Sequence, residues 1–340
     1  MSSRRIKIGV VGVGHLGRWH VQQLKAIPEA DLVGIYDIDV NRSKDICREF
    51  GVKAFPDFSQ LLDAVEAISI VTPTTTHFQY ARESLERGRH VFIEKPITET
   101  VEQGNELIEI VDRSGVKFQV GHIERFNPAI LALEDISLNP LFIESHRLST
   151  FHPRGTDVAV VLDLMIHDID LILSFVHSPV KSIQASGVSI ISPKEDIANC
   201  RLEFENGCVA NVTASRISTR KMRKMRFFQP NAYISVDFLE GSSEIYQLMD
   251  EQSGKTKEGL TFSLGQIGEE NQKKEIRYRR VEKKDINPLR YELELFLQSI
   301  KEDRPTAVTV REAVRDLAVA QAILKSIEEH TAQVRKHWRI

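Results

Sequence analysis

A short apolar run that breaks into three closely spaced glycines constrains this chain most strongly. Residues 7–11 are predicted to form a β-strand, and Gly12, Gly14 and Gly17 follow it before a helical pattern begins. In such a turn the first glycine permits the sharp bend, the second lets the backbone approach a pyrophosphate, and the third lets the helix pack closely. The helix N-terminus would offer N–H groups and partial positive charge to phosphates. Alone, the pattern also fits a glycine-rich turn that binds nothing.

A second apolar strand supplies the context that the glycines need. It is predicted over residues 32–36 and ends in Asp37, twenty positions after Gly17. An acid there can accept hydrogen bonds from both ribose hydroxyls of an adenosine and repels the 2′-phosphate of NADP. Asp39 adds negative charge, whereas Arg42 could accommodate that phosphate or stack on adenine. We therefore predict a dinucleotide site that prefers NAD over NADP.

Composition excludes several classes of function. The chain has 340 residues, 41% of them hydrophobic and 27% charged, which predicts two globular domains with sizeable cores. A net charge of -3 gives no support to nucleic-acid or acidic-membrane binding. Cys47, Cys200 and Cys208 match no zinc-binding spacing and cannot all pair, so we expect reduced thiols in a cytoplasmic protein. We expect neither a signal peptide nor a segment that crosses a bilayer.

Strand and helix patterns alternate as far as residue 122. Repeated βα units of this kind predict a doubly wound parallel sheet with helices on both faces. We therefore predict an NAD-binding Rossmann domain over residues 1–122. The expected strands are 7–11, 32–36, 52–55, 67–71, 90–93 and 116–122, and the expected helices after the first turn are 41–50, 57–64, 77–87 and 100–114.

After residue 122 the pattern changes to strands in which apolar and charged residues alternate. The pair Asn206-Gly207 predicts a tight hairpin between two of them. We predict a substrate-binding and oligomerisation α/β domain over residues 123–340, with a large, mostly antiparallel open sheet and C-terminal helices that could pack back on the first domain. The expected strands are 141–148, 200–205, 208–217, 224–228, 232–238, 244–249 and 276–281, the helices are 158–176, 289–301 and 310–329, and 252–274 is a polar loop or hairpin.

Two strand ends of the first domain carry candidate ligand-binding groups, because ligands bind at the carboxyl ends of parallel strands. In the stretch 72–77 threonine hydroxyls could contact the ribose and pyrophosphate, or cap the following helix, and both can be true. The second stretch is Glu94-Lys95-Pro96. Lys95 could point at the nicotinamide ribose and stabilise a developing alkoxide, or it could be a solvated loop lysine.

The second domain offers a candidate general base. Asp163 and His167 are four residues apart in a predicted helix and so share one face. A histidine oriented by a carboxylate is a competent base for an alcohol proton, although helix capping or a surface pair would explain the same residues. A metal site built from His167, Asp168 and Asp170 lacks further ligands, and we expect none.

Two polar stretches remain open to two interpretations each. Arg125 and Asn127, where the chain leaves the first domain, could face an interdomain cleft or form ordinary linker salt bridges. The basic stretch 216–226 could contact an anionic substrate such as a nucleotide diphosphate. We favour a charged sheet face that discourages edge pairing for this stretch.

Together these motifs resemble the glucose–fructose oxidoreductase, inositol dehydrogenase and rhizopine-catabolism (Gfo/Idh/MocA) family over nearly the whole chain. The resemblance rests on the glycine turn, Thr72-Pro73-Thr74 with His77, Glu94-Lys95-Pro96, and Asp163 four residues before His167. It implies NAD-dependent oxidation of a ring carbinol of a sugar or cyclitol, with Lys95, Asp163 and His167 as catalytic residues, and a homodimer or homotetramer built on the open sheet. The predicted cofactor-binding residues are Gly12, Val13, Gly14, His15, Leu16, Asp37, Thr72, Pro73, Thr74, His77, Glu94 and Lys95.

The stretches 121–128 and 161–170 are more particularly similar to family members that oxidise UDP-N-acetylglucosamine at C3. The resemblance implies that His167 removes the C3 hydroxyl proton as hydride leaves for nicotinamide, while Lys95 hydrogen-bonds the same oxygen; the two could exchange roles. Arg125, Asn127, Asp163 and His167 would contact the substrate. The alternatives are a related dehydrogenase for a free sugar, inositol or biliverdin-like acceptor, and a non-catalytic NAD-binding sensor.

Overall fold

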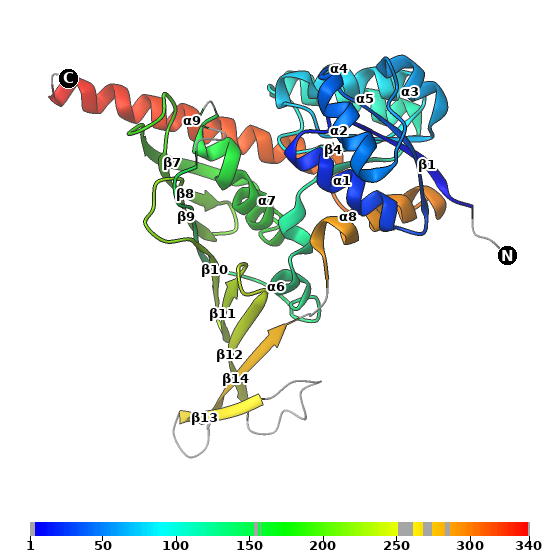
Figure 1. Ribbon diagram of the computed structural model, residues 1–340. Helices are drawn as coiled ribbons and strands as arrows, with labels where there is room; N and C mark the ends of the chain where they lie inside the picture. The colour runs from blue at the N-terminus through cyan, green and yellow to red at the C-terminus, as the bar shows by residue number, and fades with distance from the viewer. Residues whose placement is uncertain are drawn as a thin grey trace. The chain divides into compact units, whose positions relative to one another are not determined.

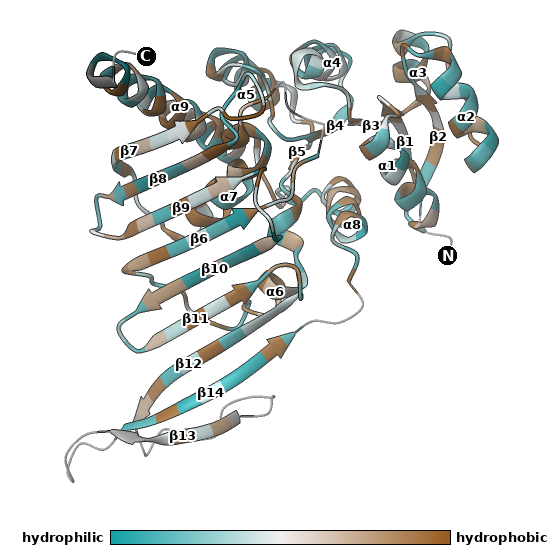
Figure 2. Cartoon of the chain, turned by 60° about the vertical axis from the view of Figure 1, so that its left-hand side comes forward, coloured by the Kyte–Doolittle hydropathy of each residue, from teal (hydrophilic) through white to brown (hydrophobic). Residues whose placement is uncertain are grey.

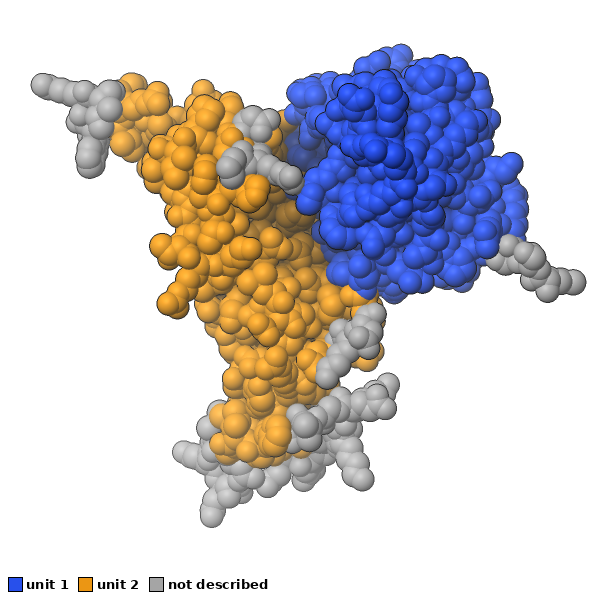
Figure 3. All heavy atoms as spheres, viewed as in Figure 1, with its two compact units in different colours: residues 1–123, 287–318 blue, residues 124–286, 319–340 orange. Residues whose placement is uncertain are grey.

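The computed structural model describes residues 4–152, 156, 158–250, 261–267, 274–282 and 286–338. The chain divides into two compact units, coloured separately in Figure 3. Unit 1 comprises Met1–Ile123 and Asn287–Ala318, and unit 2 comprises Glu124–Ile286 and Val319–Ile340. The N-terminal segment of unit 1 thus ends one residue after the expected domain boundary at residue 122. Unit 1 also includes a second segment, Asn287–Ala318, which was predicted from the sequence to belong to the second domain.

Unit 1 contains a parallel sheet of five strands in the order β2-β1-β3-β4-β5, which confirms the predicted Rossmann architecture (Figure 1). The strand order reverses between β1 and β3, and in sheets of this class ligands bind in the crevice at that reversal. The strands are β1 (Ile6–Val11), β2 (Ala30–Tyr36), β3 (Ala67–Ile70), β4 (His90–Glu94) and β5 (Phe118–Gly121). The helices are α1 (His15–Ala26), α2 (Val40–Phe50), α3 (Phe58–Ala64), α4 (Thr74–Glu86), α5 (Val101–Ser114) and α8 (Pro288–Lys301).

Local sequence signals explain most of the boundaries in unit 1. Thr100 and Gln103 form a capping box that starts α5, and Gly115 ends this helix at φ 67°. Helix α4 begins three residues before the predicted start because Pro73 precedes it, a residue tolerated at a helix start. The predicted strand 52–55 is reduced to one bridge between Ala54 and Ile35.

The core of unit 1 joins the sheet to helices from both ends of the sequence. The rings of Phe92 on β4 and Phe296 on α8 meet edge to face, with centroids 5.8 Å apart. Helix α8 therefore packs in the core of the N-terminal unit, although some 165 residues separate it from β5 in the chain. The buried apolar side chains of this core include Ile8, Val10, Val21, Leu24, Ile35, Phe92, Leu293, Phe296 and Leu297.

Unit 2 contains a nine-stranded sheet in the order β13-β14-β12-β11-β10-β6-β9-β8-β7, shown face-on in Figure 2. Strands β6 and β9 are parallel and all other neighbours are antiparallel, which confirms the predicted open sheet. The strands are β6 (Phe142–Leu148), β7 (Val180–Val188), β8 (Ile197–Phe204), β9 (Val209–Ser215), β10 (Met222–Gln229), β11 (Ala232–Asp237), β12 (Ser242–Asp250), β13 (Thr261–Ile267) and β14 (Lys274–Glu282).

The strands of unit 2 follow the predicted alternation with two additions. The hairpin between β8 and β9 turns at Asn206 and Gly207, and the glycine has φ 86°. Strand β7 was not predicted, because at the sheet edge few of its side chains are deeply buried and its sequence shows no clear alternation. Strand β13 lies within the polar stretch 252–274, where it pairs with β14; residues 252–260 and 268–273 lie outside the described residues.

One face of this sheet packs against helices and the other carries charged and aromatic side chains. The helical elements of unit 2 are the 3-10 turn Ile123–Phe126, α6 (Pro128–Leu131), a π-helical turn Val161–Met165 and α7 (Ile166–Phe175). Helix α9 (Val310–Trp338) contains the division between the units. The core-facing residues include Ile143, Cys200, Leu202, Val212, Met225, Phe227, Ile234, Ile169, Ile172, Ile323 and Ile327.

A buried ionic cluster ties this sheet to α7. Arg147 on β6 donates to both carboxylate oxygens of Asp168, at 2.8 and 3.0 Å, and to Glu124 at 2.6 Å. All three residues are at most 6% exposed. Burial would lower the pKa of Arg147, but the charges of Asp168 and Glu124 outweigh it and raise the pKa above its usual range.

We expect Arg147→Met to lower the free energy of unfolding by about 3–5 kcal/mol, because it leaves two carboxylates buried without their cation. Arg226→Met is the matched control, since Arg226 on the neighbouring strand pairs with Glu144 in a half-exposed ion pair. That variant should cost at most about 1 kcal/mol. Urea denaturation at pH 7 measures both, and equal small losses would contradict a structural role for the buried cluster.

Candidate active site

The glycine turn of unit 1 has the geometry of a phosphate cradle. A Cβ on Gly12, whose φ is 80°, would lie 2.7 Å from the carbonyl oxygen of Val71, and one on Gly17 would lie 1.9 Å from the carbonyl oxygen of Gly12. The fold itself therefore requires these two glycines. A Cβ on Gly14 would meet no atom within 4 Å, so the fold does not require this glycine. Gly14 also begins α1 without a side-chain cap, which suits a pyrophosphate at the helix N-terminus.

Asp37 lies at the end of β2 beside this turn. One carboxylate oxygen accepts the N–H of Val13 at 2.8 Å, and the other accepts the N–H of Asp39 at 2.8 Å. The acid is thereby fixed against the turn in the way that recognition of an adenosine ribose requires. Nη1 of Arg42 lies 3.3 Å from both carboxylate oxygens of Asp37. Arg42 could accommodate the 2′-phosphate of NADP, whereas Asp37 would repel this phosphate, and the two side chains are thus direct neighbours.

The loop after β3 is held by its own side chains. The hydroxyl of Thr76 donates to the hydroxyl of Thr72 at 2.8 Å and lies 2.9 Å from the carbonyl oxygen of Pro73. Helix α4 has no side-chain cap at Pro73, so the threonines do not cap it there. The ring of His77 is buried and contacts the carbonyl oxygens of Thr72 and Pro96. His77 thus links the loop after β3 to the loop after β4, and both loops are predicted from the sequence to contact the cofactor.

Glu94 is the last residue of β4, and Lys95 and Pro96 follow it in the loop. Lys95 is half-buried, and the Lys95–Pro96 peptide bond is cis. Burial would raise the pKa of Glu94, but the hydrogen bond from His20 and the nearby positive charge of Lys95 outweigh it. The pKa of Glu94 is therefore below its usual value, and the side chain is an ionised hydrogen-bond acceptor.

In unit 2, Asp163 lies on the π-helical turn and His167 on the first turn of α7. Both side chains are half-buried, whereas Asp168 and Asp170 are at most 1% exposed. The guanidinium of Arg216 lies 4.0 Å from the carboxylate of Asp163 and donates to the carbonyl oxygen of Val158 at 2.5 Å. Arg216 therefore holds the chain before the π turn and faces the acid carried on that turn.

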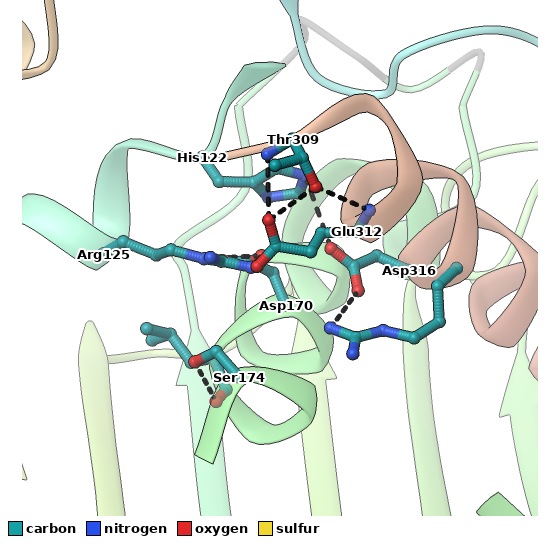
Figure 4. Close-up of polar contacts among 9 residues, drawn as sticks. His122, Arg125, Asp170, Ser174, Thr309, Glu312 and Asp316 are labelled. Atoms are coloured by element: carbon teal, nitrogen blue, oxygen red, sulfur yellow. Dashed lines mark hydrogen bonds and ion pairs between the residues drawn. The ribbon is translucent and has the colours of Figure 1, made fainter. Parts of the chain in front are cut away.

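The structure gives Arg125 and Asn127 structural partners within unit 2. The guanidinium of Arg125 lies along the carboxylate of Asp170, with contacts of 2.6–3.0 Å (Figure 4). The side-chain oxygen of Asn127 caps α6, and its amide donates to Glu124 and to the carbonyl oxygen of Phe238. These contacts give both residues structural partners, as the linker interpretation expects; a contact of either residue with a substrate stays a prediction.

The part of the basic stretch 216–226 that lies on β10 forms a charged sheet face, but our reason for predicting one was wrong. Lys224 on β10 pairs with Asp237 on β11, and Arg226 on β10 pairs with Glu144 on β6. Strand β10 lies between β6 and β11, so these charges cannot guard a sheet edge. Arg216, at the start of the stretch, is buried. Arg220 and Lys221 are exposed in the connection between β9 and β10.

Sequence reasoning missed two residues that contact candidate site residues, His20 beside Glu94 and Arg216 beside Asp163. It also missed Ser69, which contacts His20. His20 and Ser69 are buried among apolar residues of α1 and β3, and Arg216 lay within a stretch that we interpreted as a charged sheet face. The helical period of α1 would have predicted that His20 is buried, because it neighbours Val21 and precedes Leu24 by four residues. No signal in the sequence points to its partners Ser69 and Glu94, because they are 49 and 74 residues away in the chain.

Comparison with known proteins agrees with this geometry. Residues 6–122 match the family model described as "Oxidoreductase family, NAD-binding Rossmann fold", and residues 152–335 match its "C-terminal alpha/beta domain". The UDP-N-acetylglucosamine 3-dehydrogenase of Acidithiobacillus ferrooxidans is 40% identical over 242 residues, 71% of this chain and 77% of that protein. A scyllo-inositol 2-dehydrogenase (NAD(+)) of Bacillus subtilis is 29% identical over 63% of this chain and 68% of its own.

A solved structure of the same Acidithiobacillus ferrooxidans enzyme, GnnA, superposes with a TM-score of 0.85 at 35% identity, over 96% of this chain and 98% of that one. Among the described residues, no helix is long and apolar enough to span a membrane. The two family matches together cover most of the sequence, and the site residues of unit 1 fit a dinucleotide. The chain therefore belongs to the Gfo/Idh/MocA family of NAD-binding oxidoreductases.

Proposed function

We propose that this protein is an NAD-dependent dehydrogenase that oxidises the C3 hydroxyl of UDP-N-acetylglucosamine to a ketone. The observation that carries the proposal is the placement of Asp163 and His167 on adjacent helical turns of unit 2 with partly exposed side chains, while Asp168 and Asp170 on the same segment are buried in pairs with arginines. Lys95 of unit 1 is also partly exposed and directly follows β4, at the end of the parallel sheet where ligands bind. Partly exposed ionisable groups at such positions can reach a bound substrate and are candidates for proton transfer.

The dinucleotide would supply the hydride acceptor, held by the Gly14 turn and Asp37. In the proposed reaction His167 removes the proton of the sugar hydroxyl, and Lys95 hydrogen-bonds the same oxygen and stabilises its negative charge. Asp163 orients His167 or the sugar, with Arg216 beside it. Lys95 and His167 can exchange the role of proton acceptor. The proposal requires that these side chains, which come from separate units, meet at one substrate.

The nucleotide-sugar substrate is supported by two observations. The relative from Acidithiobacillus ferrooxidans is named for UDP-N-acetylglucosamine and is 40% identical, while the inositol-specific relative from Bacillus subtilis is 29% identical. The exposed cations Arg220 and Lys221 belong to a connection that begins at Arg216, beside Asp163, and suit a diphosphate. A dehydrogenase for inositol or a free sugar is the second candidate, because inositol dehydrogenases also match.

A substrate comparison tests the choice between the two. Purified protein is incubated with NAD+ and either UDP-N-acetylglucosamine, myo-inositol, scyllo-inositol or glucose, and NADH formation is followed at 340 nm, the usual absorbance of NADH. We expect the highest kcat/KM with UDP-N-acetylglucosamine and a product two mass units lighter than this substrate, since oxidation removes two hydrogens. Preference for an inositol would establish the second candidate, and no turnover with any substrate would support a sensor.

Loss of either proposed proton-transfer group should lower turnover and leave the cofactor bound. We expect Lys95→Ala and His167→Ala to lower kcat by about 10²–10⁴-fold with the NADH dissociation constant changed by less than about threefold. Lys181→Ala and His330→Ala, which remove an exposed lysine and an exposed histidine, are the matched controls. Near-normal turnover in both site variants would refute the catalytic assignment.

The preference for NAD over NADP is part of the proposal. Asp37→Ser should lower kcat/KM for NAD+ by about 10–100-fold, because the serine hydroxyl can replace one of the two ribose contacts and the loss of one charge-assisted hydrogen bond costs about 1.5–3 kcal/mol. The same variant should raise kcat/KM for NADP+, since Arg42 then pairs with a 2′-phosphate instead of Asp37. Adding Arg42→Ala should remove that gain. An NADP+ activity of the natural protein equal to its NAD+ activity would contradict the preference.

We also propose that the open face of the unit 2 sheet pairs copies of the chain into a homodimer or homotetramer. Five aromatic rings cross this face from strand to strand, with neighbouring centroids 5.0–5.5 Å apart: Phe142, Phe228, Tyr233, Tyr246 and Tyr278. A monomer in sedimentation velocity at micromolar concentration would contradict this assembly.

The three cysteines are free thiols, which supports a cytoplasmic setting.

A further inference from the structure

Lys95 has a neighbour on each side in the chain, and each neighbour is contacted by a buried histidine from a different helix. His20 of α1 contacts the side chain of Glu94, and His77 of α4 contacts the carbonyl oxygen of Pro96. Both histidines are 1% exposed. All of these groups belong to unit 1, so the arrangement is internal to one compact body.

The ring of His20 uses both nitrogens. Its Nε2 lies 3.0 Å from Oε1 of Glu94, and its Nδ1 lies 2.9 Å from the hydroxyl oxygen of Ser69 on β3. Phe92 on β4 packs edge to face against the ring, with centroids 5.5 Å apart and an interplanar angle of 62°. Because Glu94 is ionised, Nε2 of His20 is the donor to it.

The carboxylate of Glu94 also lies close to Gly121 on β5, which leaves room for it. A Cβ placed on Gly121 would lie 3.0 Å from Oε1 and 3.2 Å from Oε2 of Glu94. The carboxylate therefore lies against the backbone of β5 on one side and receives the His20 hydrogen bond on another. Any larger residue at position 121 would have to displace it.

The ring of His77 also uses both nitrogens. Its Nδ1 lies 2.8 Å from the carbonyl oxygen of Pro96, and its Nε2 lies 2.8 Å from the carbonyl oxygen of Thr72. Burial lowers the pKa of His77, although both carbonyl contacts and the charge of Glu94 favour the protonated form. A neutral ring has a single N–H and so donates to one of these carbonyls at a time.

Two buried imidazoles are costly unless their hydrogen bonds are made, because an unsatisfied polar group in a core costs about 1–3 kcal/mol. An apolar side chain would fill either position without that cost. What the two histidines share is the segment that they hold, which is the three residues Glu94, Lys95 and Pro96. Because both histidines hold the same three-residue segment, we infer that they do more than fill space in the core.

We propose that His20 and His77 are positioning residues that fix the backbone on both sides of Lys95 and thereby set the direction of its ammonium group. This inference rests on the proposed role of Lys95 in the reaction. Neither histidine touches the reacting atoms. A misplacement of a catalytic group by about 1 Å can lower turnover 10²-fold, so a frame of this kind has a measurable effect.

Isosteric variants at the two positions give a crossed test. The Asn amide nitrogen is as many bonds from Cα as Nδ1 of histidine, and the Gln amide nitrogen as many as Nε2. At position 20, Gln keeps the contact to Glu94 and Asn keeps only the contact to Ser69. At position 77, Asn keeps the contact to Pro96 and Gln keeps only the contact to Thr72. If the contacts to Glu94 and Pro96 are what hold Lys95 in place, the variants that keep these contacts, His20→Gln and His77→Asn, are the milder ones.

We expect kcat at saturating substrate and NAD+ to be about tenfold lower in His20→Asn than in His20→Gln, and about tenfold lower in His77→Gln than in His77→Asn. A second readout needs no turnover: the rate at which acetic anhydride acetylates Lys95 in the protein without substrate, measured by peptide mass spectrometry. That rate should change severalfold in His20→Asn and His77→Gln and less in their partners. The proposal would be overturned if, across the four variants, kcat and the Lys95 acetylation rate correlated with the melting temperature of each variant instead of with the contact that it retains.

Three further variants make every outcome decisive. Ser69→Ala removes only the outer hydrogen bond of His20 and keeps the contact to Glu94, so its Lys95 acetylation rate should stay near that of the natural protein. Gly121→Ala displaces the carboxylate of Glu94 and tests the frame if the histidine variants do not fold; an unchanged Lys95 acetylation rate in Gly121→Ala would then overturn the proposal. Lys95→Met tests the proposed function separately. Turnover that survives Lys95→Met removes the catalytic role of Lys95, whereas lost turnover without the crossed pattern removes only the role of the histidines.

Discussion

The close approach of α1 to the end of β1 is the constraint on which the rest of unit 1 depends. A Cβ on Gly17 would collide with the carbonyl oxygen of Gly12, so the helix can begin where it does only with glycine at this point. The approach brings the N–H of Val13 to the carboxylate of Asp37 and leaves the N-terminus of α1 uncapped. The positions proposed to bind phosphate and ribose therefore both lie beside one packing contact between a helix and a strand.

Much of the fold could be predicted because its signals are local. The glycine turn, the capping box of α5 and the Asn206-Gly207 hairpin each depend on residues a few positions apart, and each is present in the structure. Strand β7 could not be predicted, because an edge strand with half-exposed side chains shows no alternation. The π-helical turn could not be predicted either, since Val161–Met165 is an apolar run typical of an ordinary buried helix.

The sequence names candidate site residues but not their contacts. Lys95, Asp163 and His167 are named because charged residues interrupt apolar patterns at a strand end and on a helix, and because they match the motifs of the family; their catalytic role stays a prediction. The partners of Glu94, Pro96 and Asp163 could not be named, because His20, His77 and Arg216 are brought to them by the tertiary fold. A buried polar side chain on an apolar helix face signals that a partner exists, but only the packed structure says which one. Arg125 illustrates the reverse case, since its conspicuous charge is satisfied by Asp170.

The π-helical turn Val161–Met165 has a consequence for how Asp163 meets His167. A wide turn accommodates one more residue than an ordinary turn. Excising a single amino acid at position 164 or 165 would restore regular winding, and Asp163 would then precede His167 by three residues instead of four. Because an α-helix turns about 100° per residue, the acid would still neighbour the ring but would approach it from the other side. The length of this one turn, and not only the identity of its side chains, therefore sets the direction from which the carboxylate reaches the imidazole.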